Sequence, residues 1–104
     1  MKVFVKIINL NGVKNIYADD NSGACTINMH PVKYNGRDFV AKLSAVTCGW
    51  EPEYINNSVL DGTEYRIKLV NNQGKEKVII CKNKYPSNFD AFTKVISEVL
   101  KLWN

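Results

Sequence analysis

The chain of 104 residues contains one histidine, His30, and only three cysteines, Cys25, Cys48 and Cys81. A general base or an activating imidazole would therefore have to be His30. Cys25 lies an odd number of residues before His30, so the two side chains of a regular strand would point to opposite faces. The cysteine spacings match neither a disulfide framework nor a zinc site. We predict no catalytic or metal-binding residues and expect each cysteine to be a small buried hydrophobe.

Phosphate-binding loops are also missing. The glycines at positions 12, 36, 62 and 74 each stand alone in a turn pair, not in a glycine-rich loop. The polar segment 19–23 lacks the alternating acids of a calcium loop, and His30 occupies the position of its distant bidentate glutamate. These absences predict a protein that is not an enzyme and holds no cofactor.

No long hydrophobic run is present. The apolar segment 3–10 is interrupted by Lys6 and Asn9 and is not followed by a small-residue cleavage site. It therefore fits neither a signal peptide nor a membrane span, and we expect a cytoplasmic protein that does not enter a membrane. The length predicts one domain over residues 1–104.

The chain does contain several segments in which apolar and polar residues alternate, as they do in strands. Val3, Val5 and Ile7 share one face of a first strand, opposite a mixed face. Further strands are predicted wherever apolar residues alternate or run together between turn pairs such as Asn35-Gly36 and Asp61-Gly62. The continuous run 78–81 suggests a strand covered on both faces. The predicted strands cover residues 2–8, 13–18, 25–31, 38–48, 64–69 and 77–82.

The only helical period recognised in the sequence lies at its end. Six apolar residues recur there at offsets of three, four and seven, and Ser87 stands where a helix cap is expected. The stripe consists of Phe89, Phe92, Ile96, Val99, Leu100 and Trp103. The predicted fold is α+β: a single antiparallel, meander-like sheet of five or six strands with one C-terminal helix packed across one face.

Two stretches of the last third, LDGTEYRIKL and KVIICKNKYPSNFDAFTKVI, together resemble small uncharacterised bacterial or mobile-element α+β domains. The resemblance implies a hairpin opened by Asp-Gly, a short Tyr-Pro segment and a closing helix. It implies no functional residues.

Charge is distributed unevenly along the chain. Lysine and arginine total 14 against 10 acidic residues, giving a net charge of +4, and the excess lies between residues 64 and 84. Such a hairpin could neutralise phosphates while nearby aromatic rings stack on bases, although lysine far outnumbers the bidentate arginine. A solvated strand face protected by lysines is the competing interpretation. The residues of this nucleic-acid alternative are Arg66, Lys68, Lys75, Lys77, Lys82 and Lys84.

A second binding region is the loop 48–54, which places Trp50 and Tyr54 beside Glu51 and Glu53. Tryptophan and tyrosine dominate interface hot spots, and Pro52 would stiffen the loop. Trp50 could equally fold back into the core. We therefore hypothesise a small regulator, inhibitor or immunity-type module that docks on a protein partner through Trp50, Glu51, Glu53 and Tyr54. A homo-oligomer formed through a free sheet edge is left open.

Overall fold

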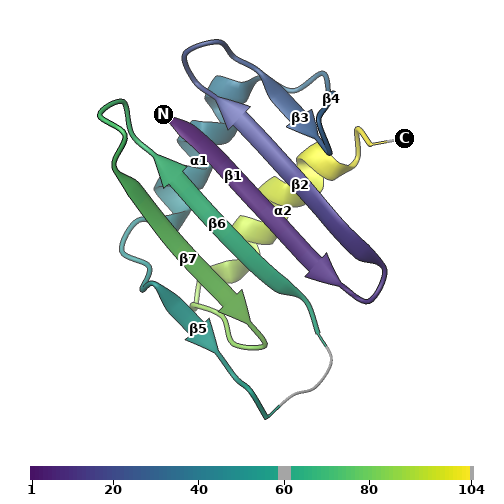
Figure 1. The fold of residues 1–104 in the computed structure, drawn as a ribbon, viewed down its shortest axis with the longest axis vertical. Coiled ribbons are helices and arrows are strands. Elements are labelled where there is room, and N and C mark those ends of the chain that lie inside the picture. Colours follow the sequence, from purple (N-terminus) through teal and green to yellow (C-terminus); the bar gives the residue numbers. More distant parts are fainter. Residues whose placement is uncertain (59–61, 104) are drawn as a thin grey trace.

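The computed structural model describes residues 1–58 and 62–103 and has an α+β fold, with one seven-stranded sheet and two helices (Figure 1). The strand order in the sheet is β4-β3-β2-β1-β6-β7-β5. The strands are β1 (Lys2–Asn9), β2 (Gly12–Asp19), β3 (Cys25–Ile27), β4 (His30–Pro31), β5 (Glu53–Ile55), β6 (Glu64–Val70) and β7 (Glu76–Lys82). The helices are α1 (Gly36–Thr47) and α2 (Phe89–Leu100).

The sheet is mixed and has seven strands, which corrects the expectation of a single antiparallel, meander-like sheet of five or six strands. β1 lies between β2 and β6 and pairs with both in antiparallel register, as β6 does with β7. β5, which lies inside the segment predicted as loop, pairs in parallel with β7. A three-residue strand is too short to show alternation, so no pattern of residues predicts it. The predicted Asp61-Gly62 turn lies partly outside the described residues, because Asp61 is not among them.

The longest predicted strand, 38–48, is wrong because these residues form α1. Its buried positions follow a helical period, since Phe39, Val40, Leu43 and Thr47 all face the core. Asn35 does not open a hairpin but caps the helix, accepting a hydrogen bond from the backbone N–H of residue 37. In this segment, apolar residues fit both the alternation of a strand and the period of a helix. The capping Asn35 is the local feature that distinguishes the helix from a strand.

The C-terminal helix is confirmed, with Phe92, Val95, Ile96 and Val99 buried along α2, but it ends before Trp103, the last residue of the predicted stripe. Its cap differs from the expectation, because the N-cap residue is Asn88 and makes no side-chain capping bond. The Asn88 amide instead donates to the Val46 carbonyl at 3.0 Å. It thereby joins the start of α2 to the last turn of α1.

Both helices lie on the same face of the sheet, behind the strands in Figure 1. The buried strand residues point toward them and form one core with Phe39, Leu43 and Phe92. Neither described helix is long and apolar enough to cross a membrane. The opposite face of the sheet has no helix over it among the described elements.

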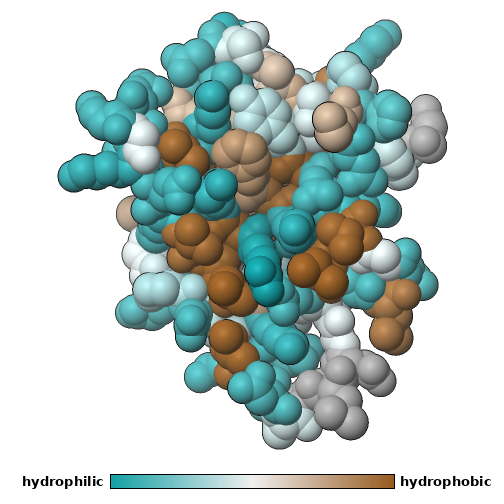
Figure 2. All heavy atoms as spheres, viewed as in Figure 1, coloured by the Kyte–Doolittle hydropathy of each residue, from teal (hydrophilic) through white to brown (hydrophobic). Residues whose placement is uncertain are grey.

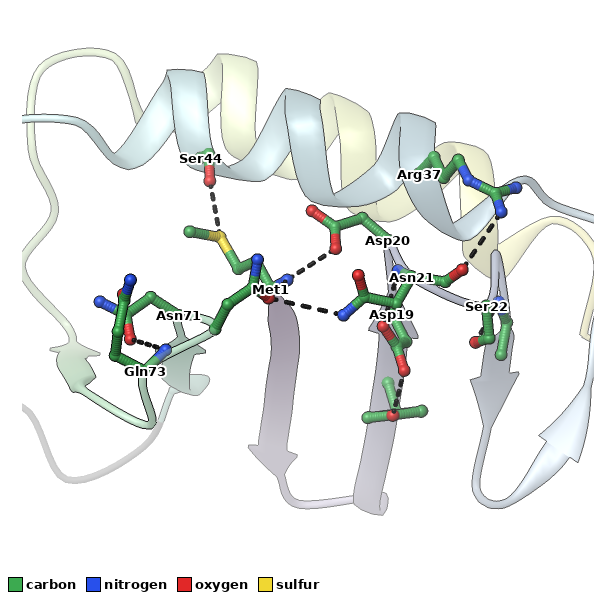
Figure 3. A network of polar contacts seen from close by, with 12 residues as sticks. Met1, Asp19, Asp20, Asn21, Ser22, Arg37, Ser44, Asn71 and Gln73 are labelled. Carbon is green, nitrogen blue, oxygen red and sulfur yellow. Dashed lines mark hydrogen bonds and ion pairs between the residues drawn. The ribbon is translucent and has the colours of Figure 1, made fainter.

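One end of the sheet is tied to α1 by polar contacts (Figure 3). The Met1 ammonium donates to Asp20 at 2.6 Å, and the Ser44 hydroxyl of α1 contacts the Met1 sulfur at 3.1 Å. Arg37, in the first turn of α1, donates to the Asn21 carbonyl at 3.2 Å. These contacts fix the helix across the ends of β1 and β2.

Candidate binding surface

The open face is the side of the sheet turned away from the helices. Because side chains alternate along a strand, each central strand contributes every second residue to it. Its centre is formed by Phe4 and Lys6 of β1, Asn15 and Tyr17 of β2, Arg66 and Lys68 of β6, and Val78 of β7. Figure 2 looks onto this face and shows hydrophobic residues gathered over the middle of the sheet among hydrophilic ones.

Two aromatic rings lie at the centre of the open face. Phe4 and Tyr17 are direct cross-strand partners, and their ring centroids are 5.0 Å apart. The Lys68 ammonium lies 4.7 Å from the centroid of the Phe4 ring, which is a cation–π contact. Partial burial raises the pKa of the Tyr17 hydroxyl, and the neighbouring carboxylate of Asp19 raises it further. The centre of the open face is thus an aromatic surface with a cation beside it.

The groove in this face has a volume of about 330 Å³. Phe4, Tyr17 and Val78 give it an apolar lining, and Val78 is 44% exposed. The composition of the run 78–81 suggested a strand covered on both faces, and this prediction is wrong. Ile79 and Cys81 face the core, whereas Val78 faces the groove. We call this hollow the central groove.

Three cations line the central groove, and they differ in how firmly they are held. The Arg66 guanidinium is bonded to the Glu64 carboxylate on the same strand. Lys68 is 3.9 Å from Glu76, and 41% of the Lys68 side chain is exposed. Lys6 is exposed, and no ion pair involves it among residues 1–58 and 62–103. Lys6 and Lys68 are consequently the cations most available to a ligand.

The six basic residues predicted from the hairpin do not form one surface. Arg66, Lys68 and Lys82 belong to the register positions of the open face. Lys77 turns toward α1, where its ammonium donates to the Thr47 carbonyl at 3.4 Å. Lys75 lies in the turn between β6 and β7, and Lys84 is exposed beyond the end of β7. The structure therefore splits this set between both sides of the sheet.

The loop 48–54 places its aromatic residues inward. Trp50 is only 7% exposed, and its indole N–H donates to the Asn88 side chain at 2.8 Å. Its ring lies 5.7 Å from that of Phe92 and 6.4 Å from that of Tyr54. The half-buried Tyr54 hydroxyl accepts a hydrogen bond from the Glu51 backbone N–H at 2.9 Å. The sequence left open whether Trp50 lies at an interface or in the core, and in the structure it lies in the core.

Glu51 and Glu53 of the same loop are exposed. Because the neighbouring Trp50 is buried, these two carboxylates have no exposed tryptophan beside them to act as a hot spot. The aromatic anchor proposed from the sequence is thus missing from this surface.

The residues weighed for catalysis lie apart. His30 is exposed on the edge strand β4, with its ring centroid 5.8 Å from that of Trp103. Cys25 and Cys81 are buried as expected, and burial raises the pKa of each thiol to about 11. Cys48 is exposed at the end of α1, so the expectation of burial is wrong for this residue. Within the described parts of the chain, no three histidine, cysteine or acidic side chains gather in a way that could hold a metal ion.

Sequence reasoning missed the residues at the centre of the open face. Phe4, Lys6 and Tyr17 belong to the first hairpin, whereas the charge excess drew attention to the second. The signal was present in the mixed outer face of the first strand, where an aromatic residue alternates with lysines. Its meaning depends on β1 pairing with β6, which places Phe4 beside Lys68.

No protein-family model matches the sequence, and comparison with curated proteins and with solved structures found no significant match.

Proposed function

We propose that this chain is a small non-enzymatic binding protein that docks on a protein partner through its open face. The observation that carries the proposal is the Phe4–Tyr17 ring pair at the centre of that face, in the same groove as the 44% exposed Val78. An antiparallel sheet with one face against helices usually turns polar side chains to water on the other. An apolar area rimmed by polar residues is typical of an interaction site.

The arrangement of charge favours a protein over a nucleic acid. Affinity for nucleic acid comes largely from cations that neutralise successive phosphates. On the open face, Arg66 and Lys68 already have carboxylate neighbours, and Lys77 lies toward α1. An apolar centre with a few rim charges instead fits the usual composition of protein interfaces.

Site-specific photo-crosslinking in the native host tests this proposal. A benzophenone amino acid replaces Val78 on the open face in one variant and the exposed Ala45 of α1 in a matched control. We expect Val78 to give a protein adduct that survives nuclease, and Ala45 to give none. Adding Phe4→Ala to the Val78 variant should reduce the yield of this adduct, because it removes the centre of the contact.

Three results would overturn the proposal. Equal adducts at both positions would show that the open face is not selected. An adduct destroyed by nuclease would transfer the function to nucleic-acid binding, and an adduct of twice the chain's own mass would show that a second copy covers this face.

A further inference from the structure

The charges that line the central groove indicate the chemistry of its occupant. Lys6, Arg66 and Lys68 are among the side chains lining it, and no aspartate or glutamate of residues 1–58 and 62–103 lines it. Glu64 and Glu76, the carboxylates that pair with two of these cations, lie outside the lining. A ligand in the groove therefore meets positive charge above an apolar floor.

The volume of the central groove indicates what can enter it. About 330 Å³ is enough space for one large side chain or two small ones. The Phe4 and Tyr17 rings with Val78 provide aromatic and aliphatic contact for such a side chain. Many interfaces concentrate their binding free energy in a few large side chains that fill pockets near the centre of the contact.

Lys68 is placed to respond to this occupant. Its partner Glu76 is 3.9 Å away and exposed, and ion pairs of that kind contribute little to stability. Its ammonium lies over Phe4, on the surface that an entering side chain would contact. A carboxylate brought by the partner into a partly dehydrated interface would attract Lys68 more strongly than Glu76 does in water.

We propose that the partner presents an acidic segment with one apolar side chain, which enters the central groove while its flanking carboxylates pair with Lys68 and Lys6. This inference rests on the proposed docking function and specifies the partner's chemistry. The +4 net charge of the chain would also speed its encounter with an acidic partner.

Short peptides serve as probes in an NMR titration of the isotope-labelled full chain. The capped peptide EDFDE carries an apolar anchor between acids, KKFKK reverses the charges, and EDADE removes the anchor. We expect EDFDE at millimolar concentration to shift the amide signals of Lys6, Tyr17 and Lys68. Both analogues should bind about tenfold more weakly or worse, a factor equivalent to about 1.4 kcal/mol.

Variants of the protein locate the contact. Lys68→Gln and Lys6→Gln should each weaken the binding of EDFDE severalfold. Lys94→Gln, at an exposed position on α2, should leave its affinity unchanged. Unchanged affinity in both groove variants would overturn the inference, as would equal or tighter binding of KKFKK. Failure of EDFDE to shift any groove signal would also overturn it.

The proposed docking function is judged separately, by the Val78 crosslink. A protein adduct there, with no response to EDFDE, would keep the docking surface and reject the acidic segment. Tighter, salt-sensitive binding of a uridine decanucleotide at the same amide signals would reject both proposals.

Discussion

The two faces of the sheet are built by the same strands but have different compositions. On β1, Val3, Val5 and Ile7 are almost completely buried, while Phe4 and Lys6 alternate with them on the other side. The covered face is aliphatic and is closed by two helices, as a protein core requires. The open face combines aromatic rings with cations. We therefore expect the covered face to account for most of the stability, and we propose the open face for recognition.

The aromatic residues divide in the same way. Trp50 and Phe92 pack within the core beside α2, whereas Phe4 and Tyr17 pair on the open face. An aromatic residue in the sequence is therefore no guide to recognition until the face it occupies is known. Substitutions on the two faces should separate folding from binding.

The largest expected effect is that of Trp50→Ala. It would leave a cavity beside Phe92 and remove the hydrogen bond to Asn88, and we expect a loss of about 3–5 kcal/mol in the free energy of unfolding. Phe4→Ala is the matched control on the open face and should cost about 1 kcal/mol, as expected for a cross-strand pair. Urea denaturation followed by circular dichroism measures both. Equal losses would mean that the two faces do not differ in their contribution to stability.

A smaller loss is expected for Gly36→Ala, where α1 begins against the sheet. A Cβ atom added to Gly36 would lie 2.1 Å from the Ala24 carbonyl oxygen, so the helix would have to move. We expect a destabilisation of about 1–3 kcal/mol, as for other overpacked sites. Intrinsic helix propensity alone predicts the opposite sign, a gain of about 0.5–1 kcal/mol.

The melting temperature of the Gly36→Ala variant shows whether it is less stable or more stable than the parent. Ala41→Gly, at an exposed position of the same helix, is the control, and it should cost about 0.5–1 kcal/mol through propensity alone. A more stable Gly36→Ala variant would show that α1 does not pack against the loop before β3 as closely as described.

Local patterns predicted most of the sheet and the last helix. The strands of both hairpins and α2 were predictable because one face of each is buried and the period is clear. The segment 36–47 was not, since Phe39 and Leu43 fit both periods, while Ala41 and Ala45, which are exposed on α1, extend the alternation of a strand. β5 was missed because its three residues gain their place only from pairing with β7.

The binding surface was less predictable than the fold. The charge excess pointed to Arg66 and Lys68, and both line the central groove. Their neighbours Phe4, Lys6 and Tyr17 come from strands distant in the sequence, and only the register of β1 with β2 and β6 brings them together. Trp50 was predicted as a binding residue from its residue type and is not on the surface. The sequence does not reveal that Asn88 and Phe92 hold its ring inside the core.

The smallest expected effect lies on the outer surface of the helices, where a polar cluster joins α1 to α2. The Lys42 ammonium donates to the Tyr34 hydroxyl and to Glu98, at 2.9 and 3.2 Å, and the Tyr34 hydroxyl donates to Glu98 at 3.0 Å. The hydrogen bond from Lys42, followed by that from Tyr34, lowers the pKa of the Glu98 carboxyl below its usual 4.5. The contribution to stability is therefore present above the unfolded-state pKa and is lost as the pH falls through the folded-state pKa.

Glu98→Gln tests this contribution, because glutamine keeps the shape of the side chain and removes its charge. The variant should be slightly less stable than the parent at about pH 6, and the difference should shrink as the pH falls toward about 3. Thermal melts of both proteins across this range measure the difference. The cluster is exposed to water, so its effect should remain well below that of Trp50→Ala. A difference in stability that stays constant with pH would show that Glu98 acts through packing alone. A difference as large as that of Trp50→Ala would show that this surface cluster contributes as much to stability as the covered face of the sheet.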